Sequence, residues 1–248
     1  MTIAASRGAL AVAGLALAAG TAEACGPYEH DGMSYTLCRA EAERDTLRLW
    51  HTGPDGTVLG SFDAVDALLS EEGARLGFAM NAGMYHPDRS PVGLYVEDGE
   101  QRAPLVTNPG PGNFGLLPNG VFCIRTDGFE VIETRSFAET QPDCRHATQS
   151  GPMLVLDGAL HPRFTEGSES RFIRNGVGVS EDGRRAYFAI SQEPVTFHEF
   201  ARLFRDALET PQALYLDGNI SRLHAPALNR SDWGRRMGPI LGTVRPAE

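Results

Sequence analysis

The stretch GFAMNAGMYH (residues 77–86) passes from a short apolar run directly into a glycine-containing turn with polar side chains. An apolar and aromatic run bounded by turn-forming residues is typical of a β-strand. Asn and Gly then favour a tight turn, because both tolerate backbone conformations that other residues avoid. The same pattern recurs along the chain and predicts many short strands. The further runs expected to form strands are 47–50, 92–96, 120–124, 153–156, 177–179, 186–190, 213–216 and 240–244.

Two segments between these runs predict helices. The clearer one begins at Thr196, whose side chain can cap a helix while Glu199 closes a capping box. A second helix is expected over 62–72. Many strands and few helices, without strict alternation, predict an α+β fold with a mixed β-sheet flanked by a few helices in a single domain. The side chains expected to face the core are Phe197, Phe200, Leu203, Phe204, Ala207 and Leu208 in the first helix, and Val65, Leu68 and Leu69 in the second.

The first 24 residues predict a secretory signal peptide. A basic residue precedes the apolar run 9–19, and Ala-Glu-Ala at 22–24 forms the cleavage site. The apolar run is shorter than the roughly 20 residues that a membrane-spanning helix needs, so we expect no transmembrane segment. Residues 25–248 then form one exported domain, periplasmic or extracellular.

A lipid anchor is the competing interpretation of the same region. Cys25 would be the first residue of the mature chain, where a cysteine can be acylated. Lipoproteins usually carry Leu at the third position before that cysteine, and Ala22 stands there instead. Lipid anchoring at Cys25 is therefore less favoured than release of the mature protein.

All four cysteines follow the expected cleavage site, which places an even number in an oxidising compartment. Three pairings are possible. We favour the pairs that are close in sequence, Cys25 with Cys38 and Cys123 with Cys144. Buried free thiols are the alternative, since spacing alone does not establish a bridge.

The formal net charge of −10 argues against nucleic acid as a partner, because phosphate backbones bind basic surfaces. The sequence has no P-loop and no dinucleotide-binding fingerprint, so we expect no nucleotide cofactor. Its seven histidines form no H-x-x-x-H pattern and its cysteines form no C-x-x-C pattern, so we expect no catalytic transition metal. Acidic loop side chains leave a structural calcium open.

Two glycine-containing segments beside expected strands offer donors for a small ligand. In NAGMYH (81–86), Asn81 follows a strand, and Gly83 lets the backbone turn so that its amides can meet an anionic oxygen. In QSGP (149–152), Ser150 supplies a hydroxyl and Gly151 a backbone donor. Ser150 lacks the G-x-S-x-G frame of an acyl-transfer nucleophile, so we expect it to bind substrate. A plain turn is the alternative for each segment.

Three further side chains are candidate catalytic groups. Arg174 precedes a glycine-flanked strand, and its planar, permanently charged guanidinium suits a phosphate or carboxylate. Asp217 ends an apolar run before Gly218 and Asn219, as expected for a carboxylate projected from a strand end into a cleft. His86 lies in the same loop as Asn81 and can exchange protons. The alternatives are a surface ion pair for Arg174, an Asx turn for Asp217 and a surface role for His86.

The order of these segments resembles the phosphodiester glycosidase family, over about residues 78–244. FAMNAGMY (78–85) is similar to the N-G/A-G-F/M-F/Y element of the family, and QSGPMLV (149–155) to its S-G-P segment. RNGVG (174–178) resembles its R-x-A/G-x-G strand, and LDG (216–218) the start of its L-D-G-G-G-S loop.

An uncharacterised bacterial branch of the family is similar in more places. It shares the stretches PDRSPVGLY (87–95), PGNF (111–114), PNGVF (118–122) and MGPI (237–240). The chain departs from the family at 219–222, where NISR replaces further glycines and a serine. Those glycines let backbone approach a phosphate, so Asn219 alters that approach. Arg222 adds a cation that either compensates or lies outside the cleft.

The resemblance implies a hydrolase acting on a sugar-1-phosphodiester, with a carbohydrate or sugar-phosphate substrate from envelope glycans or glycolipids. It implies that Arg174 and the amides of Gly83, Gly151 and Gly218 hold the phosphate, and that Asp217 handles proton transfer or the sugar. Asn81, Ser150 and Asn219 would orient the substrate, with His86 as a further acid or base. The alternative function is a non-catalytic envelope protein that binds phosphorylated or acidic glycans through the same cleft. A third, purely structural role leaves Arg174 and Asp217 without a purpose.

Overall fold

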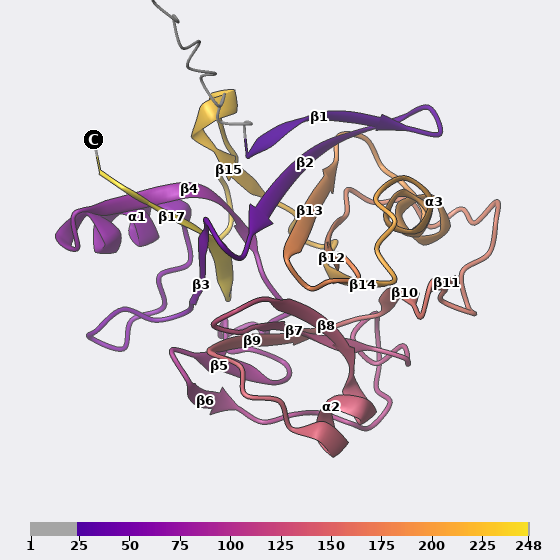
Figure 1. Ribbon diagram of the computed structural model, residues 1–248, viewed down its shortest axis with the longest axis horizontal. Coiled ribbons are helices and arrows are strands. Elements are labelled where there is room, and N and C mark those ends of the chain that lie inside the picture. Colours follow the sequence, from indigo (N-terminus) through magenta and orange to yellow (C-terminus); the bar gives the residue numbers. More distant parts are fainter. Residues whose placement is uncertain (1–23, 248) are drawn as a thin grey trace, which may run out of the picture.

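The computed structural model describes residues 24–247, whose strands form three sheets (Figure 1). The strands of the largest sheet are β1 (Cys25–His30), β2 (Met33–Glu41), β10 (Met153–Leu156), β11 (Ala159–Leu160), β12 (Asn175–Val179), β13 (Arg185–Ser191) and β14 (Gln212–Asp217). Their order across the sheet is β1-β2-β13-β12-β14-β10-β11. The sheet therefore joins the beginning of the described chain to its second half.

The two smaller sheets have five strands each. One contains β3 (Thr46–Trp50), β4 (Ala74–Asn81), β15 (Leu223–Ala225), β16 (Arg230–Ser231) and β17 (Ile240–Pro246). The other contains β5 (Tyr95–Glu97), β6 (Glu100–Ala103), β7 (Gly120–Ile124), β8 (Phe129–Glu133) and β9 (His146–Ser150). Their orders are β16-β15-β4-β17-β3 and β6-β5-β9-β7-β8.

The α+β class holds, but the expected single mixed sheet is wrong. Every strand pair in the described part of the chain is antiparallel. An apolar run shows where a strand is, but it does not show which neighbour the strand pairs with or in which direction.

Aromatic side chains from the three sheets meet in one core. The ring of Phe78 on β4 lies 5.4 Å from that of Phe188 on β13, and Phe122 on β7 lies 5.7 Å from Phe188. All three side chains are completely buried. The largest sheet and the two smaller ones thus close around a shared interior.

Both expected helices are confirmed. Helix α1 (Phe62–Glu71) buries Val65 and Leu69 and is capped by the Ser61 hydroxyl, which accepts from the Ala64 amide. Helix α3 (Phe197–Arg202) begins with the expected capping box, because the Thr196 hydroxyl accepts from the Glu199 amide and the Glu199 carboxylate from the Thr196 amide. A π-helical turn over 203–207 continues it, and α3 packs on the largest sheet through a cluster of buried side chains (Figure 1).

Helix α2 (Thr134–Thr140) and several strands were not expected from the sequence. The most consequential of them is β9, HATQS, which carries no apolar alternation and yet is buried at all five positions. Gln149 and Ser150, assigned to a loop above, lie in this strand. Hydrogen bonds make its polar side chains compatible with burial: the Gln149 amide bonds the backbone of Leu94 and Val106.

The run 92–96 forms a strand only from Tyr95 onward. The amide of Leu94 donates to the side chain of Gln149, and the amide of Val92 donates to the carbonyl of Met84. A side chain and a loop carbonyl thus satisfy these two amides, and the strand is shorter than the predicted element.

The two expected disulfides, Cys25–Cys38 and Cys123–Cys144, are both present, and the described part of the chain has no free cysteine. Cys25 and Cys38 face each other across β1 and β2. A sulfur held in a disulfide is not available for acylation, so this bond agrees with the lower weight given to lipid anchoring at Cys25.

The signal peptide predicted over 1–24 lies outside the described residues, apart from Ala24. Among the residues that are described, no helix is long and apolar enough to cross a membrane. The same part of the chain contains no group of three or more His, Cys, Asp or Glu side chains arranged to hold a metal ion.

Three strand ends converge where the largest sheet meets the sheet of β4. Strand β4 ends at Asn81, β14 ends at Asp217, and β12 begins at Asn175. Asn175 and Asp217 are register partners in the antiparallel pair β12–β14. The antiparallel pairing therefore brings the segments RNGVG (174–178) and LDG (216–218) together at this edge, and the end of β4 adds NAGMYH (81–86).

Candidate active site

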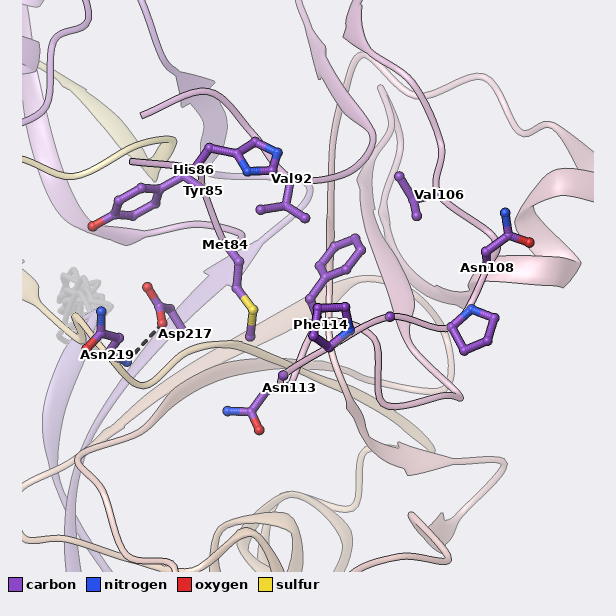
Figure 2. Close-up of a pocket in the computed structure, with 14 residues that line it drawn as sticks. Met84, Tyr85, His86, Val92, Val106, Asn108, Asn113, Phe114, Asp217 and Asn219 are labelled. Atoms are coloured by element: carbon purple, nitrogen blue, oxygen red, sulfur yellow. Dashed lines mark hydrogen bonds between the residues drawn. The ribbon is translucent and has the colours of Figure 1, made fainter. Parts of the chain in front are cut away.

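A pocket of about 540 Å³ opens beside this edge (Figure 2). Its walls come from the loop after β4, from the long loop between β6 and β7, and from the end of β14. Figure 2 shows Asp217 and Asn219 at one side and Asn108 at the other, with Met84 and Phe114 between them. The lining residues are Met84, Tyr85, His86, Val92, Val106, Asn108, Pro109, Gly110, Pro111, Gly112, Asn113, Phe114, Asp217 and Asn219.

Asp217 is a buried carboxylate fixed at the pocket wall, with 8 % of its surface exposed. Its Oδ1 accepts from the amides of Gly218 at 2.6 Å and Asn219 at 2.9 Å. Burial raises the pKa of Asp217 above its usual value, although the amides of Asn219, Gly218 and Ile220 act in the opposite direction. The Asx turn considered above is thus present, and the same carboxylate also lines the pocket.

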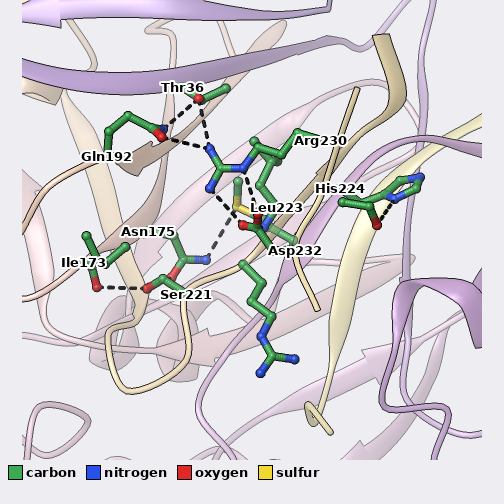
Figure 3. A network of polar contacts seen from close by, with 12 residues as sticks. Thr36, Ile173, Asn175, Gln192, Ser221, Leu223, His224, Arg230 and Asp232 are labelled. Atoms are coloured by element: carbon green, nitrogen blue, oxygen red, sulfur yellow. Dashed lines mark hydrogen bonds and ion pairs between the residues drawn. The ribbon is translucent and has the colours of Figure 1, made fainter. Parts of the chain in front are cut away.

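Asn175 holds the backbone of Asp217 in place, and the side chain is completely buried. Its Oδ1 accepts from the Asp217 amide at 3.1 Å and from the Ser221 hydroxyl at 3.3 Å. Its amide group donates to the Asn81 carbonyl at 3.1 Å and to Asn81 Oδ1 at 3.2 Å. Figure 3 shows Asn175 and Ser221 side by side, with Ser221 also bonded to Ile173. One side chain therefore joins β4, β12 and the loop after β14.

Asn81 faces this network rather than the pocket. The side chain is completely buried, and its Oδ1 accepts from the backbone amide of Arg222 at 2.9 Å. Asn81 therefore fixes the loop that follows Asp217. The structure shows it as a support of the site, which differs from the direct substrate contact expected from the sequence.

Gly83, Ser150 and Gly151 also lie behind the pocket wall. The Ser150 hydroxyl donates to the Leu216 carbonyl at 2.7 Å, which ties β9 to β14. A Cβ on Gly83 would lie 2.6 Å from the Gln149 carbonyl oxygen, and one on Gly151 would lie 2.5 Å from Cβ of Asn119. Gly83 and Gly151 have no room for a side chain because these neighbours approach closely, and neither they nor Ser150 line the pocket.

Arg174 lies completely inside the protein and forms no ion pair with a described carboxylate, so the alternative of a surface ion pair does not apply. Its guanidinium donates to the carbonyls of Val195 and Ser170 and to the Tyr215 hydroxyl. It also lies 3.6 Å from the ring centroid of Phe197. Burial lowers the pKa of Arg174, while Tyr215 raises it. Arg174 does not line the pocket with Asp217.

Tyr215 connects Arg174 to the loop that follows Asp217. A Cβ on Gly218 would lie 1.7 Å from the Tyr215 hydroxyl oxygen, so the backbone of Gly218 rests directly on this phenol. Arg174 thus contacts Tyr215, and Tyr215 contacts Gly218, the residue next to Asp217. Through this contact Arg174 supports the loop from behind.

Of the nine site residues predicted from the sequence, the pocket brings together Asp217, Asn219 and His86. Asn219 and His86 are exposed at its rim. The loop that carries His86 is closed by its own hydrogen bonds, since the His86 amide donates to the Ser90 carbonyl at 2.8 Å. The other six residues surround this group without lining the pocket.

Sequence reasoning missed Asn175 and Tyr85 as site residues, although both lie within segments that it singled out. Tyr85 lines the pocket, and its hydroxyl is buried with no hydrogen-bond partner in the described part of the chain. The loop 108–114, which forms one wall, was visible only as the family-like stretch PGNF. Two asparagines in that wall, Asn108 and Asn113, add polar groups to an otherwise apolar surface.

Comparison with known proteins gives a consistent picture. A family model described as phosphodiester glycosidase matches residues 74–238. The Escherichia coli K12 protein described as "Uncharacterized protein YigE" is 34 % identical over 192 residues, which cover 77 % of this chain and 73 % of that protein.

Two solved structures share the fold. The zebrafish N-acetylglucosamine-1-phosphodiester alpha-N-acetylglucosaminidase catalytic domain superposes with a TM-score of 0.60 at 15 % identity, covering 88 % of this chain and 81 % of that one. A hypothetical protein from Synechocystis superposes with a TM-score of 0.55 at 13 % identity, covering 89 % and 61 %. At these identities the similarity concerns the fold.

Proposed function

Since the chain belongs to the phosphodiester glycosidase family, we propose that it is an exported hydrolase that cleaves sugar-1-phosphodiesters of glycans or glycolipids in the cell envelope. Phosphodiester glycosidases are hydrolases that act on sugar phosphodiesters. The envelope substrate, the export of the chain and the roles of individual residues belong to the proposal.

The observation that carries the proposal is the position of Asp217. Its carboxylate lies at the wall of a pocket, is largely shielded from water and is held by consecutive backbone amides. A carboxylate fixed in this way keeps one orientation, which is what proton transfer to or from a bound substrate requires.

The chemistry of the substrate explains how one such carboxylate can suffice. Hydrolysis joins a water oxygen to the anomeric carbon and breaks the bond from that carbon to the phosphodiester oxygen, whose electrons leave with a phosphomonoester. The second pKa of a phosphomonoester is about 6, so it departs at neutral pH without a proton from a general acid. Asp217 would accept the proton of the attacking water, or stabilise the positive charge that develops on the sugar.

The remaining wall suits a carbohydrate. Met84, Val92 and Phe114 offer apolar surface for the C–H face of a sugar ring, while Asn108 and Asn113 offer amides for its hydroxyls. His86 at the rim is the proposed second group for proton exchange, and Asn219 the proposed contact next to Asp217.

Two disulfides support a location outside the reducing cytosol, because thiols there are kept reduced. The predicted signal peptide agrees with this location. An acidic surface and a pocket of about 540 Å³ favour a small glycan group over a nucleic acid as the ligand.

A second candidate function is glycan binding without turnover. The residues that line the pocket favour this function, because Asp217 is the only carboxylate among those that the structure describes there. Most glycosidases use a pair of carboxylates. A binding protein would use the same walls and would release no product.

Hydrolysis of chromogenic sugar-1-phosphodiesters, including the N-acetylglucosamine derivative, separates the two functions. Asp217→Asn keeps the amide contacts but cannot accept a proton, so we expect it to lose turnover by about 10²–10⁴-fold while glycan binding is retained. Asp182→Asn is the matched control, because Asp182 also accepts from a backbone amide in a turn but lies in a different part of the surface.

The result decides between three outcomes. Turnover by the parent and by Asp182→Asn, with loss in Asp217→Asn, supports the hydrolase. Binding without product from folded protein supports the glycan-binding function. Loss of turnover in a parallel set with chelator would assign a metal ion to the site.

A further inference from the structure

Three arginines gather around Tyr85 at the edge of the pocket. The guanidinium carbon of Arg89 lies 5.4 Å from the centroid of the Tyr85 ring. A Cβ on Gly238 would lie 2.5 Å from Cγ of Tyr85, so the backbone of Gly238, three residues after Arg235, packs against Tyr85 as well. The Arg222 guanidinium donates to the carbonyl of Arg235. Arg89, Arg222 and Arg235 therefore belong to one group, here called the arginine rim.

The loop from 233 to 238 shapes this group. A Cβ on Gly234 would lie 2.5 Å from Nη2 of Arg222, so the guanidinium packs closely against the backbone of Gly234. Gly234 has φ +143°, a backbone conformation that favours glycine. Arg222 thus has a fixed position, while the side chain of Arg235 is exposed to solvent.

None of the three arginines forms an ion pair with a carboxylate in the described part of the chain. This is unusual in a protein with a net charge of −10, in which most other described arginines contact Asp or Glu. Three neighbouring cations without anions repel one another, and a bound anion would relieve that repulsion. These three arginines without an ion pair lie together next to Tyr85, a residue that lines the pocket.

The hydroxyl of Tyr85 adds an unused hydrogen-bonding group to the same place. It is buried without a partner among the described residues. Figure 2 shows it pointing to the side of the pocket where Asp217 and Asn219 lie. Burial and Asp217 raise the pKa of Tyr85, while Arg89, Arg222 and Arg235 lower it, so all four charged groups act on this one phenol. The arginine rim and Asp217 thus both lie close enough to the Tyr85 hydroxyl to act on it, and Tyr85 and Asp217 line the same pocket.

We propose that Arg89, Arg222, Arg235 and the Tyr85 hydroxyl form the subsite for the phosphodiester group of the substrate, next to Asp217. Arg174 does not take this part, because its guanidinium is consumed by carbonyls and aromatic rings inside the protein. The subsite deepens the proposed hydrolase function and rests on it for the identity of the substrate. Guanidinium groups suit the ligand, because each can donate two parallel hydrogen bonds to phosphate oxygens.

The chain contains a local reporter for this subsite. Of its two tryptophans, Trp233 is 92 % exposed and lies two residues before Arg235, whereas Trp50 is 2 % exposed in the core. Titration with dimethyl phosphate, a minimal phosphodiester, is therefore followed by the fluorescence of Trp233 and by phosphorus NMR of the ligand.

The variants are Arg222→Gln, Arg235→Gln and their combination, with Arg236→Gln as the matched control. Arg236 is the next residue along the loop, but its guanidinium donates to the carbonyls of Val58 and Leu59. We expect the double variant to bind dimethyl phosphate at least about tenfold more weakly than the parent, since hydrogen bonds to charged groups have this effect. Arg236→Gln should bind within about twofold of the parent, as expected of a surface change away from the ligand.

The same proteins are then assayed for hydrolysis. Parallel losses of dimethyl phosphate affinity and of kcat/KM in the Arg222→Gln and Arg235→Gln variants support the subsite. If both variants bind and hydrolyse like the parent, the subsite is wrong and the hydrolase stands. If the parent hydrolyses nothing, but the Arg222→Gln and Arg235→Gln variants bind dimethyl phosphate more weakly than the parent, the subsite is supported and the hydrolase function is wrong.

Discussion

Replacing Asn175 by alanine removes the side chain that holds Asp217 to β4. The two shortest bonds of its amide, from the Asp217 amide and to the Asn81 carbonyl, are each 3.1 Å long. Each such bond contributes about 1 kcal/mol net, and a buried group left without a partner costs about 1–3 kcal/mol. We therefore expect Asn175→Ala to lower the free energy of unfolding by about 2–6 kcal/mol.

Urea unfolding, monitored by circular dichroism, measures this change. Gln192→Ala is the control, because Gln192 also donates an amide hydrogen bond, to Thr36, but its side chain is exposed. Its effect should stay near the 0.5 kcal/mol that is usual for surface substitutions. The variants that remain folded are then compared in kcat/KM.

The stability and the activity should change together. Without Asn175, the backbone of Asp217 loses a fixed acceptor, and the carboxylate loses its alignment with the pocket. We expect kcat/KM to fall by at least about tenfold in Asn175→Ala and to stay unchanged in Gln192→Ala. An Asn175→Ala protein that unfolds within 1 kcal/mol of the parent and keeps its kcat/KM would refute the assigned role.

Four further predictions concern the loop that begins at Asp217 and the stability of the protein. Because burial raises the pKa of Asp217, the acidic limb of kcat/KM should lie above pH 3.8, with activity lost as the pH falls through it, and Asp217→Asn should lack this limb. The same raised pKa means that the ionised carboxylate opposes folding, so Asp217→Asn should be at least as stable as the parent in urea at pH 7, and a loss above 1 kcal/mol would contradict this. Gly218→Ala would place its Cβ 1.7 Å from the Tyr215 hydroxyl oxygen, so the loop must shift; we expect at least a tenfold loss of kcat/KM, and parent-like kinetics would exclude the contact. Each disulfide closes a short loop and contributes about 3 kcal/mol, so full reduction should lower stability by about 6 kcal/mol, to be measured by urea unfolding with and without reductant.

The sequence predicts elements whose cause is local. The capping box of Thr196 and Glu199 depends on four consecutive residues, and the structure contains it as expected. Most apolar runs became strands for the same reason. The direction of strand pairing depends on residues far apart in sequence, and so the antiparallel arrangement could not be read from the runs.

Strand β9 shows a second limit. Its residues HATQS have no apolar periodicity, and the strand is buried because side chains such as Gln149 find partners on Leu94 and Val106. Those partners lie about 40 residues away or more, as in the contact of Val106 with Gln149 at a separation of 43. A polar segment whose bonds are distant is indistinguishable from a loop in the sequence.

The sequence predicted which segments form the candidate site. It did not predict in which direction their side chains point. Arg174 and Asn175 are consecutive, and successive side chains of an extended backbone point to opposite sides. One therefore enters the aromatic cluster around Phe197, and the other bonds to Asn81. The sequence favoured the Arg174 guanidinium as a site group, whereas the side-chain amide of Asn175 makes the contact with Asp217.

The contrast between the arginine rim and the remaining surface also determines how fast an anionic substrate can reach the pocket. At a distance the substrate meets the field of a protein with a net charge of −10, which slows its approach. Within about 8–10 Å, the screening length at ordinary ionic strength, it meets the three arginines instead. Adding salt to a dilute buffer should first accelerate the encounter, by screening the distant repulsion, and then weaken the bound complex. The dependence of kcat/KM on ionic strength would thus pass through a maximum, unlike the steady decline of an enzyme whose charge attracts its substrate throughout.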